Sequence, residues 1–525
     1  MPNRLARAYK LLDEMRTGLG ATEISDRDLH RQSKQVEVLV RRLTRSAGCA
    51  QILRDPVGTG KTTVTLAAAR LLLAEDRIDY LLVIAPNKTI AKQWLERSVP
   101  NFGVQEPSKR TDRWAKNRLI VGTHRVHPKR MSPCPARTLV IIDEAHRGLQ
   151  DETAEAFLGT AEVARGAMTL LVTATPYQLT TTGFTTMLSI AGEAKSNEDE
   201  TLKAYGSAVA SLLRHWDPLQ SPEAVSDLLA EAEKQRDRSE SLLKRHLVPR
   251  TTVDAPSPPS LQLTVVPIGA WATAYTVARV VPELIGVGKN DAYQRGLASS
   301  SETLWSQEWA VGRKVRHLRA LGDGDISEFF DNLQDGLGQG RDHPKVAATV
   351  SWVCNQAREG RNVVVFTAWL PSQRVLGEVL GTELEGVADV TAPATGQMIP
   401  GDLMSRFTSR PVGKPVVLVL SDRFSESIDL DGGLPSIVHH DLTWNPVRLT
   451  QRWGRVVRIR TGFEKVPADR IYIPVLDIEV ESRLAKVVVG RRSMAGMMVP
   501  DSKKAESDAW TLPDEVLKRI ALGFG

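Results

Sequence analysis

The chain places short runs of aliphatic and β-branched residues between longer stretches of helical character. Four such runs lie at residues 80–85, 118–122, 138–143 and 169–175. They are apolar almost throughout and do not alternate with polar residues, which is typical of parallel strands that are buried on both faces. The first part of the chain therefore predicts an α/β sheet that is covered by helices.

The strand pattern stops after residue 190 and returns beyond Pro344. The stretch 191–250 is charged and helix-prone, and the Pro/Ser-rich segment 254–260 is typical of a connector. Helical patterning with several tryptophans continues over 270–335. The later apolar runs lie at 362–368, 415–420, 436–442 and 470–476. We therefore expect an α/β protein with two parallel-sheet lobes and helical insertions between them.

This division predicts five segments. They are a first lobe with N-terminal helices at 1–190, a helical extension and connector at 191–260, a helical insertion at 261–340, a second lobe at 341–490 and a C-terminal tail at 491–525. The repeated strand pattern also permits the interpretation that the two lobes are distant copies of one architecture.

Composition excludes several classes of protein. The chain has 525 residues, of which 42% are hydrophobic and 25% charged, and these values predict several globular domains and exclude disordered and collagen-like chains. The net charge of +6 permits a partner lined with phosphates without requiring one.

Cysteine usage and the lack of long apolar runs indicate where the protein works. Cys49, Cys134 and Cys354 lie far apart and form no C-x-x-C pair, which argues against a disulfide framework and against a zinc site. No apolar run approaches the ~18 residues of a membrane span. The N-terminal residues carry charges throughout and do not resemble an export signal. We expect a soluble protein of the reducing cytoplasm with no membrane partner.

The segment 55–63, DPVGTGKTT, follows an apolar run and precedes a helix-forming stretch. This order of strand, loop and helix is what a phosphate-binding loop requires. Gly58 and Gly60 allow backbone N–H groups to turn inward, Lys61 supplies a point charge for the β- and γ-phosphates, and the Thr62 hydroxyl suits Mg²⁺. The nucleotide-binding residues that we expect are Asp55, Gly58, Thr59, Gly60, Lys61, Thr62 and Thr63. The alternative is a fortuitous Gly-rich turn, and Asp55 departs from the Gly or Ala that usually opens the motif.

A second signal is the sequence DEAH at 143–146, directly after an apolar strand. Ligands bind at the carboxyl ends of parallel strands, which is where Asp143 and Glu144 emerge. We expect Asp143, with Thr62, to hold Mg²⁺ through water and Glu144 to orient or deprotonate the attacking water. An acidic turn on a solvated surface is the alternative, but it leaves the phosphate loop upstream without its usual partner.

Taken in order, these motifs resemble the motor core of superfamily-two helicases. In the first lobe they are DPVGTGKT, APNKTIAKQW (85–94), GTHR (122–125), DEAH and TATP (173–176). In the second they are VVVFT (363–367), SDRFSESIDL (421–430) and HHDLTWNPVRLTQRWGRVVR (439–458). The resemblance spans about residues 30 to 490. The Asp at the head of the loop, the Gln-Trp pair and the WNP-x-x-x-x-QR-x-GR-x-x-R pattern resemble most closely the Swi/Snf-type branch, which includes chromatin remodellers and bacterial double-stranded-DNA translocases.

The resemblance implies that both lobes are RecA-like and that Arg455 and Arg458 are arginine fingers. A guanidinium that arrives from the opposite lobe stabilises the charge that spreads over the γ-phosphoryl oxygens. The resemblance also places Gln451 beside them as a catalytic contact to nucleotide or water. By itself, this Arg-rich helix is equally compatible with a solvated face or a grip on a phosphate backbone.

Other roles follow from the same resemblance. Asp429 would meet the ribose or the other lobe, and Thr173 and Thr175 would couple the nucleotide state to contact between the lobes. Ser427 stands where the family usually has Gly. Gln32 or Gln35, upstream of the phosphate loop, is a candidate for reading adenine.

The residues that the resemblance assigns to the nucleic-acid track are less specific. Lys88, Thr123, Arg125 and Thr367 correspond to segments that touch the phosphate backbone, and hydroxyl or cationic groups suit that contact. The tryptophans at 271, 305 and 309 are better explained as core anchors of the helical insertion than as platforms for base stacking.

The sequence therefore predicts an ATP hydrolase that uses ATP and Mg²⁺ to move on nucleic acid, with double-stranded DNA as the favoured track. One alternative is a DEAH-type helicase that separates strands of DNA or RNA. Another is a weakly hydrolysing adapter in a larger DNA-processing or phage-defence assembly, although Lys61, Glu144, Arg455 and Arg458 favour an active hydrolase. No nuclease, methyltransferase or zinc motif is present, so any cutting or modification would come from a protein partner.

Overall fold

The computed structural model describes most of both lobes and part of the segments between them. The described residues are 3–18, 24–45, 50–55, 58–98, 103–104, 118–123, 135–145, 168–173, 200–201, 204–205, 207–208, 211, 222–249, 263–288, 291–321, 324–394, 397–410, 413–422, 428–443, 446–457, 466–485 and 488.

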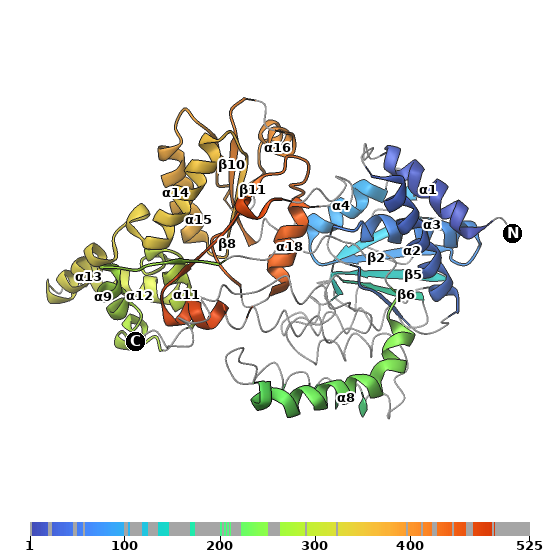
Figure 1. The fold of residues 1–525 in the computed structure, drawn as a ribbon, viewed down its shortest axis with the longest axis horizontal. Helices are drawn as coiled ribbons and strands as arrows, with labels where there is room; N and C mark the ends of the chain where they lie inside the picture. The colour runs from blue at the N-terminus through green and yellow to red at the C-terminus, as the bar shows by residue number, and fades with distance from the viewer. Residues whose placement is uncertain are drawn as a thin grey trace.

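The first lobe is built on a sheet of six strands in the order β1-β6-β5-β2-β4-β3, and every neighbouring pair is parallel (Figure 1). The strands are β1 (Gln51–Leu53), β2 (Tyr80–Ala85), β3 (Gly103–Val104), β4 (Arg118–Thr123), β5 (Thr138–Asp143) and β6 (Met168–Val172). All four apolar runs predicted in this part of the chain are strands. The central strand β5 is buried at every position, which explains why its sequence does not alternate.

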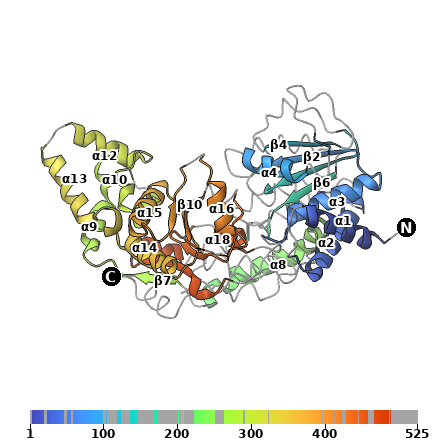
Figure 2. The ribbon, with the colours of Figure 1, turned by 90° about the horizontal axis from the view of Figure 1, so that it is seen from above.

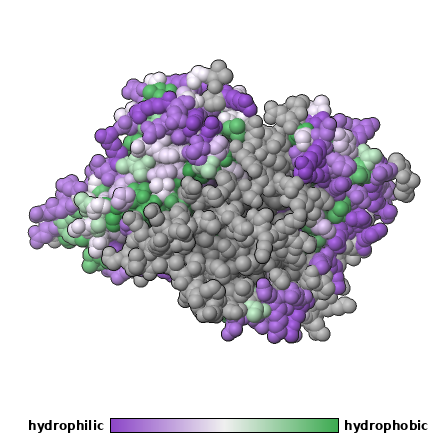
Figure 3. All heavy atoms as spheres, viewed as in Figure 1, coloured by the Kyte–Doolittle hydropathy of each residue, from purple (hydrophilic) through white to green (hydrophobic). Residues whose placement is uncertain are grey.

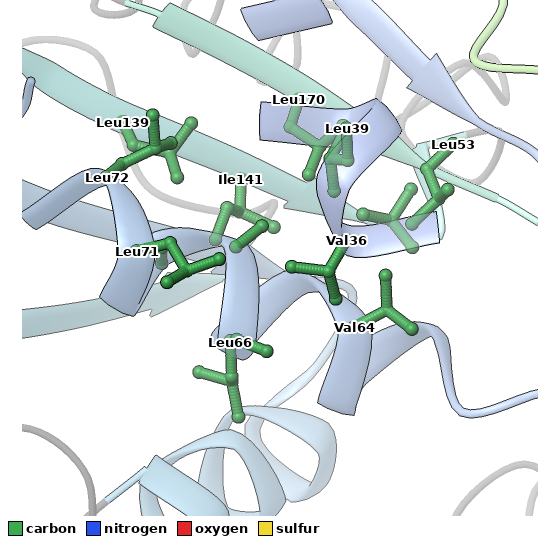
Figure 4. Packing of buried hydrophobic residues seen from close by; sticks show 14 of the residues in the cluster. Val36, Leu39, Leu53, Val64, Leu66, Leu71, Leu72, Leu139, Ile141 and Leu170 are labelled. Carbon is green, nitrogen blue, oxygen red and sulfur yellow. The ribbon is translucent and has the colours of Figure 1, made fainter. Parts of the chain in front are cut away.

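Helices cover this sheet because they bury one apolar face against it. They are α1 (Arg4–Gly18), α2 (Asp26–Arg45), α3 (Lys61–Ala74) and α4 (Lys88–Ser98). On α2 the buried Leu29, Val36, Leu39 and Leu43 recur at helical spacing. In Figure 4 the side chains of α2 and α3 meet those of β5 and β6 in one apolar core. The core thereby fixes α3, and with it the loop that precedes α3, against the strand ends.

The second lobe repeats the topology of the first. Its six strands lie in the order β7-β12-β11-β8-β10-β9, again with parallel neighbours. They are β7 (Leu263–Val266), β8 (Val363–Thr367), β9 (Asp389–Thr391), β10 (Val416–Ser421), β11 (Ser436–His439) and β12 (Ile471–Leu476). Counted along each lobe separately, both sheets follow one strand order, first, sixth, fifth, second, fourth and third. The predicted α/β fold with two RecA-like lobes is confirmed, and the shared order supports the interpretation that the lobes are copies of one architecture.

Among the described residues, four helices flank the second sheet, and their ends follow local sequence signals. They are α14 (Pro344–Arg358), α15 (Leu370–Glu383), α16 (Gly401–Thr408) and α18 (Pro446–Val456). A short 3₁₀ turn, Ala468–Arg470, precedes β12. Pro344 opens α14 at a first-turn position, where proline loses no hydrogen bond. The boundary that the sequence indicates near Pro344 is therefore the start of this helix.

The helical segment between β7 and α14 belongs to the topology of the second lobe. Its helices are α9 (Trp271–Ala278), α10 (Val281–Leu284), α11 (Asp291–Ser299), α12 (Ala310–Ala320) and α13 (Gly324–Leu337), with 3₁₀ turns at Ser301–Thr303 and Gly340–Asp342. Because β7 pairs with β12, the second sheet begins upstream of the segment and not at residue 341. Together with α14, the segment thus occupies the position that the phosphate loop and α3 occupy in the first lobe.

The tryptophans of this segment lie in its core. Trp271 is 5% exposed and donates its indole N–H to the Leu337 carbonyl at 3.1 Å. Trp305 and Trp309 pack against the same apolar cluster, which also contains Leu476 from β12. The interpretation as a core anchor is confirmed for Trp271, whereas Trp305 and Trp309 are half-buried against that core. The shared cluster joins the segment to the second lobe.

A long helix leads back to the first lobe. Helix α8 (Pro222–His246) lies below the first lobe in Figure 1 and extends from there toward the second lobe in Figures 1 and 2. At its carboxyl end, Leu247 forms a parallel bridge to Ile52 of β1, and Val248 donates its N–H to the Ile52 carbonyl at 3.0 Å. The chain that leaves the first lobe is therefore anchored on the strand that leads into the phosphate loop.

Most of the described surface in Figure 3 is hydrophilic, especially over the first lobe on the right. Apolar side chains show mainly at the lower left, over the helical segment of the second lobe. Among the described residues, no helix has the length and apolar character that crossing a membrane requires.

Candidate functional site

The loop between β1 and α3 has the backbone shape that the sequence predicts. Gly58 and Gly60 have φ angles of +83° and +84°, in the left-handed region where a side chain is strained. Gly60 caps the first turn of α3, so the N–H groups of that turn point into the loop. Thr59 is buried between the two glycines, and Thr62 and Thr63 are half-buried. Residues 56 and 57 lie outside the described part of the chain.

Lys61 turns back over this loop. Its Nζ donates to the backbone carbonyl of Asp55 at 3.0 Å. Burial lowers the pKa of Lys61, and the charges of Glu144, Asp55 and Asp143 only partly oppose that effect. A phosphate placed in the loop would add the negative charge that favours the ammonium form.

The two carboxylates emerge from the end of β5 as the sequence predicts. The Glu144 N–H donates to Asp143 Oδ1 at 3.0 Å, and the Trp94 indole N–H donates to Asp143 Oδ2 at 2.7 Å. Burial and the neighbouring Glu144 raise the pKa of Asp143 to about 6. Glu144 itself has a φ of +46°, a conformation that is uncommon for a residue with a side chain. Such local strain gathers at functional sites, because the surrounding structure must hold it in place.

Asp143 and Thr62 are the two residues that the sequence predicts to hold Mg²⁺. Both offer oxygen, the ligand atom that this hard cation prefers, and Mg²⁺ keeps several waters when it binds protein. Among the described residues, no group of three or more His, Cys, Asp or Glu side chains is placed to hold a metal. These residues therefore fit a site in which one carboxylate, one hydroxyl and the nucleotide phosphates bind the metal, better than a site made of protein ligands alone.

Gln32, on helix α2, holds the phosphate loop by a hydrogen bond. It is 2% exposed on α2, and its Nε2 donates to the Thr59 carbonyl at 2.9 Å. The Nε2 of Gln35 donates instead to the Pro249 carbonyl at 3.2 Å. The prediction that one of them reads adenine is untested, but Gln32 has a contact to the loop that sequence reasoning missed. The available signal was a polar residue on the apolar face of α2.

Arg455 brings a cation from the second lobe to this site. It lies on α18, which Figures 1 and 2 show on the side of the second lobe that faces the first. Its positive charge contributes to the lowered pKa of Lys61, so the two side chains are electrostatic neighbours across the lobes. Its Nη1 lies 3.9 Å from Asp429 Oδ1, and its carbonyl accepts the Leu430 N–H at 2.9 Å.

The remaining predicted residues are placed only in part. Gln451 is 7% exposed on α18, and Thr173 is fully buried, with its N–H donating to the Leu53 carbonyl of β1 at 3.0 Å. Lys88 begins α4, and Thr123 ends β4. Arg125, His146, Thr175, Ser427 and Arg458 lie outside the described residues.

Sequence reasoning missed Trp94 and Arg452 as parts of this region. Each is the second residue of a pair that the sequence displays, Gln93-Trp94 and Gln451-Arg452. Both are almost completely buried, Trp94 at 1% and Arg452 at 0% exposure. A large polar side chain that is fully buried needs a partner, and in each case the partner is an aspartate.

Comparison with known proteins gives matches that agree with these motifs. Residues 28–178 match the family described as type III restriction enzyme, res subunit. Over 446 residues the chain is 23% identical to the Bacillus subtilis (strain 168) protein named "Uncharacterized ATP-dependent helicase YqhH", with 81% of this chain and 72% of the relative covered.

Two solved structures are similar at low identity. For the Sulfolobus solfataricus SWI2/SNF2 ATPase core in complex with dsDNA, the identity is 16% and the TM-score 0.36, with 93% of this chain and 96% of that chain covered. For the Pyrococcus furiosus Hef helicase domain, the identity is 15% and the TM-score 0.45, with 85% and 96% covered. TM-scores this low do not establish a common fold, so the RecA-like assignment rests on the strand order of the two sheets.

Proposed function

We propose that this ATP hydrolase, a motor of the superfamily-two helicase type, moves along double-stranded DNA without separating its strands. The observation that carries the proposal is the position of Arg455. It lies on α18, which faces the first lobe in Figures 1 and 2, and its positive charge acts on Lys61 of that lobe. A nucleotide in the loop would therefore contact both lobes, and its hydrolysis would change how the lobes meet.

Each residue of the site has a part in this mechanism. Backbone N–H groups at Gly58 and Gly60 and the Lys61 ammonium bind the phosphates. Glu144 orients the attacking water and accepts its proton, and Arg455 stabilises the charge on the γ-phosphoryl oxygens. Movement follows because the closed and open arrangements of the lobes alternate with the nucleotide, so that each lobe grips the track in turn.

Two side chains would hold Mg²⁺ in this mechanism. Thr62 and Asp143 would hold Mg²⁺, Asp143 through water. When bound, Mg²⁺ supplies positive charge to the β- and γ-phosphate oxygens. The bonds from Trp94 and from the Glu144 N–H fix the direction of the Asp143 carboxylate before any metal arrives.

Two features favour duplex DNA over a single strand. The WNP-x-x-x-x-QR-x-GR pattern resembles the Swi/Snf-type branch, whose members include translocases on double-stranded DNA. In addition, Trp271 is buried in the core of the helical segment, and Trp305 and Trp309 pack half-buried against it. They are thus not exposed as the aromatic platforms on which single-strand-binding proteins stack bases.

A comparison of four ATPase assays tests this function, with no nucleic acid, single-stranded DNA, duplex DNA and duplex RNA. We expect duplex DNA to give the largest stimulation, largely independent of base sequence, because phosphates and not base edges are gripped. Stimulation by single strands alone would instead support a strand-separating helicase. No stimulation by any of them would support the nucleotide-dependent adapter.

The same grip predicts strong salt dependence of binding. If about six to ten phosphates are contacted, affinity for duplex DNA falls by roughly 10³ to 10⁵ between about 50 and 200 mM salt, since bound counterions are released. Fluorescence anisotropy with two duplexes of unrelated sequence measures this. A weak salt dependence combined with a preference for one sequence would contradict a motor that tracks the backbone.

A further inference from the structure

A buried carboxylate in the second lobe holds the loop that follows β8. Asp441 lies just beyond β11 and is 3% exposed. Its Oδ2 accepts hydrogen bonds from the Thr367 hydroxyl at 2.6 Å and from the Ala368 N–H at 2.8 Å. The Thr367 hydroxyl also accepts the Trp369 N–H at 3.2 Å. Asp441 therefore fixes the backbone of residues 367–369, which we call the β8 loop.

The same aspartate is bound to the helix that carries Arg455. Arg452 donates from Nη1 to the Asp441 carbonyl at 2.9 Å, and from Nε to Asp422 Oδ1 at 3.0 Å. Arg452 and Arg455 are three positions apart on α18, a spacing that places them on one side of the helix. A continuous series of bonds thus joins Arg455, through α18 and Arg452, to Asp441 and the β8 loop.

The burial of these groups indicates that they fix geometry. Arg452, Thr367 and Lys345 are all 0% exposed, and the Lys345 ammonium lies 2.6 Å from Glu481 Oε1 and 3.8 Å from Asp441 Oδ1. A buried ion network adds little net stability over apolar residues of similar volume. Its hydrogen bonds, however, are directional, and together they allow the β8 loop few alternative positions.

Asp441 stays ionised in this setting. Burial alone would raise its pKa, but His440, Lys345 and the hydrogen bonds from Thr367 and Ala368 together hold the pKa below its ordinary value. A carboxylate accepts both bonds from the β8 loop only while it carries no proton on Oδ2. The link between α18 and the loop is therefore intact at neutral pH.

The β8 loop lies where a track is expected. It follows the carboxyl end of β8, a central strand of the second sheet, and ligands of parallel sheets bind at that edge. The Thr367 side chain is buried, so the predicted contact to a phosphate backbone falls to the half-buried Ala368 and Trp369 and not to this hydroxyl. Trp369, half-buried, packs against Trp309 with ring centroids 5.1 Å apart, which supports the loop from the helical segment.

We propose that Asp441 is a positioning residue that transmits the position of α18 at the ATP site to the β8 loop at the track. This inference rests on the proposed function, because it requires that nucleotide and duplex DNA bind to one protein. Helix α18 takes two positions relative to the first lobe, and which one it takes depends on whether Arg455 contacts a γ-phosphate. Asp441 makes the β8 loop follow that helix.

Linkage between the two ligands tests the proposal. The affinity of the full chain for a fluorescein-labelled duplex is measured with and without Mg²⁺ and the slowly hydrolysed analogue ATPγS. In the wild type we expect the analogue to change duplex affinity by about fivefold or more, as coupled sites commonly do. In Asp441→Ala the ratio should fall close to one, because the side chain that accepts both bonds from the β8 loop is removed.

A matched control separates loss of coupling from loss of stability. Ser436 lies at the opposite end of β11, is fully buried, and shares a 2.6 Å hydrogen bond with Gln356 Oε1. Ser436→Ala removes one buried hydrogen bond on the same strand, and we expect it to keep the wild-type ratio. A ratio that falls equally in both variants would mean that general loosening, and not Asp441, accounts for the effect.

A second pair of variants covers the case in which Asp441→Ala does not fold. Thr367→Val removes the hydroxyl at nearly constant volume, whereas Thr367→Ser retains it. We expect the ratio to collapse in the valine variant and to persist in the serine variant. A wild-type ratio in a folded Asp441→Ala protein, or in Thr367→Val, overturns the inference alone. A wild-type chain that binds no duplex overturns the proposed function and this inference with it.

Discussion

Replacement of Glu144 by Gln is expected to abolish ATP turnover while nucleotide binding persists. The amide has nearly the same shape as the carboxylate, but it cannot take a proton from the attacking water. Loss of a general base at this position should lower single-turnover hydrolysis by about 10² to 10⁴-fold. The affinity for a fluorescent ATP analogue, measured separately, should change little, because Lys61 and the backbone of the loop still hold the phosphates.

A control on the same lobe is Glu96→Gln. Glu96 is on α4 and its side chain is 62% exposed, so we expect this variant to hydrolyse ATP at the wild-type rate. Near-normal turnover by Glu144→Gln would remove Glu144 from the mechanism. The strained backbone at Glu144 would then need another explanation.

The second large effect concerns Arg455. Arg455→Ala should reduce turnover by about 10³ to 10⁵-fold, the range over which arginine fingers act. Binding of ATP should weaken far less, because the guanidinium meets charge that develops mainly in the transition state. Arg455→Lys should remain severely impaired, since an ammonium retains the charge but not the planar fork.

The same helix supplies a control for this residue. Arg448 is also on α18, with its side chain 47% exposed and paired with Asp422. We expect Arg448→Ala to retain most of the turnover. If the two alanine variants behave alike, the effect reflects damage to α18 and not the loss of a finger.

The motifs of the ATP site could be predicted because each is local in the sequence. The phosphate loop needs two glycines and a lysine within a few residues, and the acidic pair needs only a preceding strand. The long strand β5 could also be predicted from its sequence, because every position is buried and its apolar run is therefore uninterrupted. The short strands β7 and β9 were missed, since β7 has only its two end residues buried and β9 is half-buried throughout.

The contacts between distant parts of the chain could not be predicted. Trp94 is separated from Asp143 by 49 positions, and Thr367 from Asp441 by 74. No local pattern pairs such residues, because the fold of the sheet brings them together. The place of Arg455 beside Lys61 was expected from resemblance alone, and its physical basis became visible only in the charges that surround Lys61.

Displacement of a third strand from a DNA triplex tests the central claim most directly. A motor that moves along closed duplex pushes the third strand off, so release should require ATP and should fail in Arg455→Ala, while a forked duplex of equal length stays paired. Efficient unwinding of the fork, with the third strand left in place, would contradict the account and identify a strand-separating helicase instead.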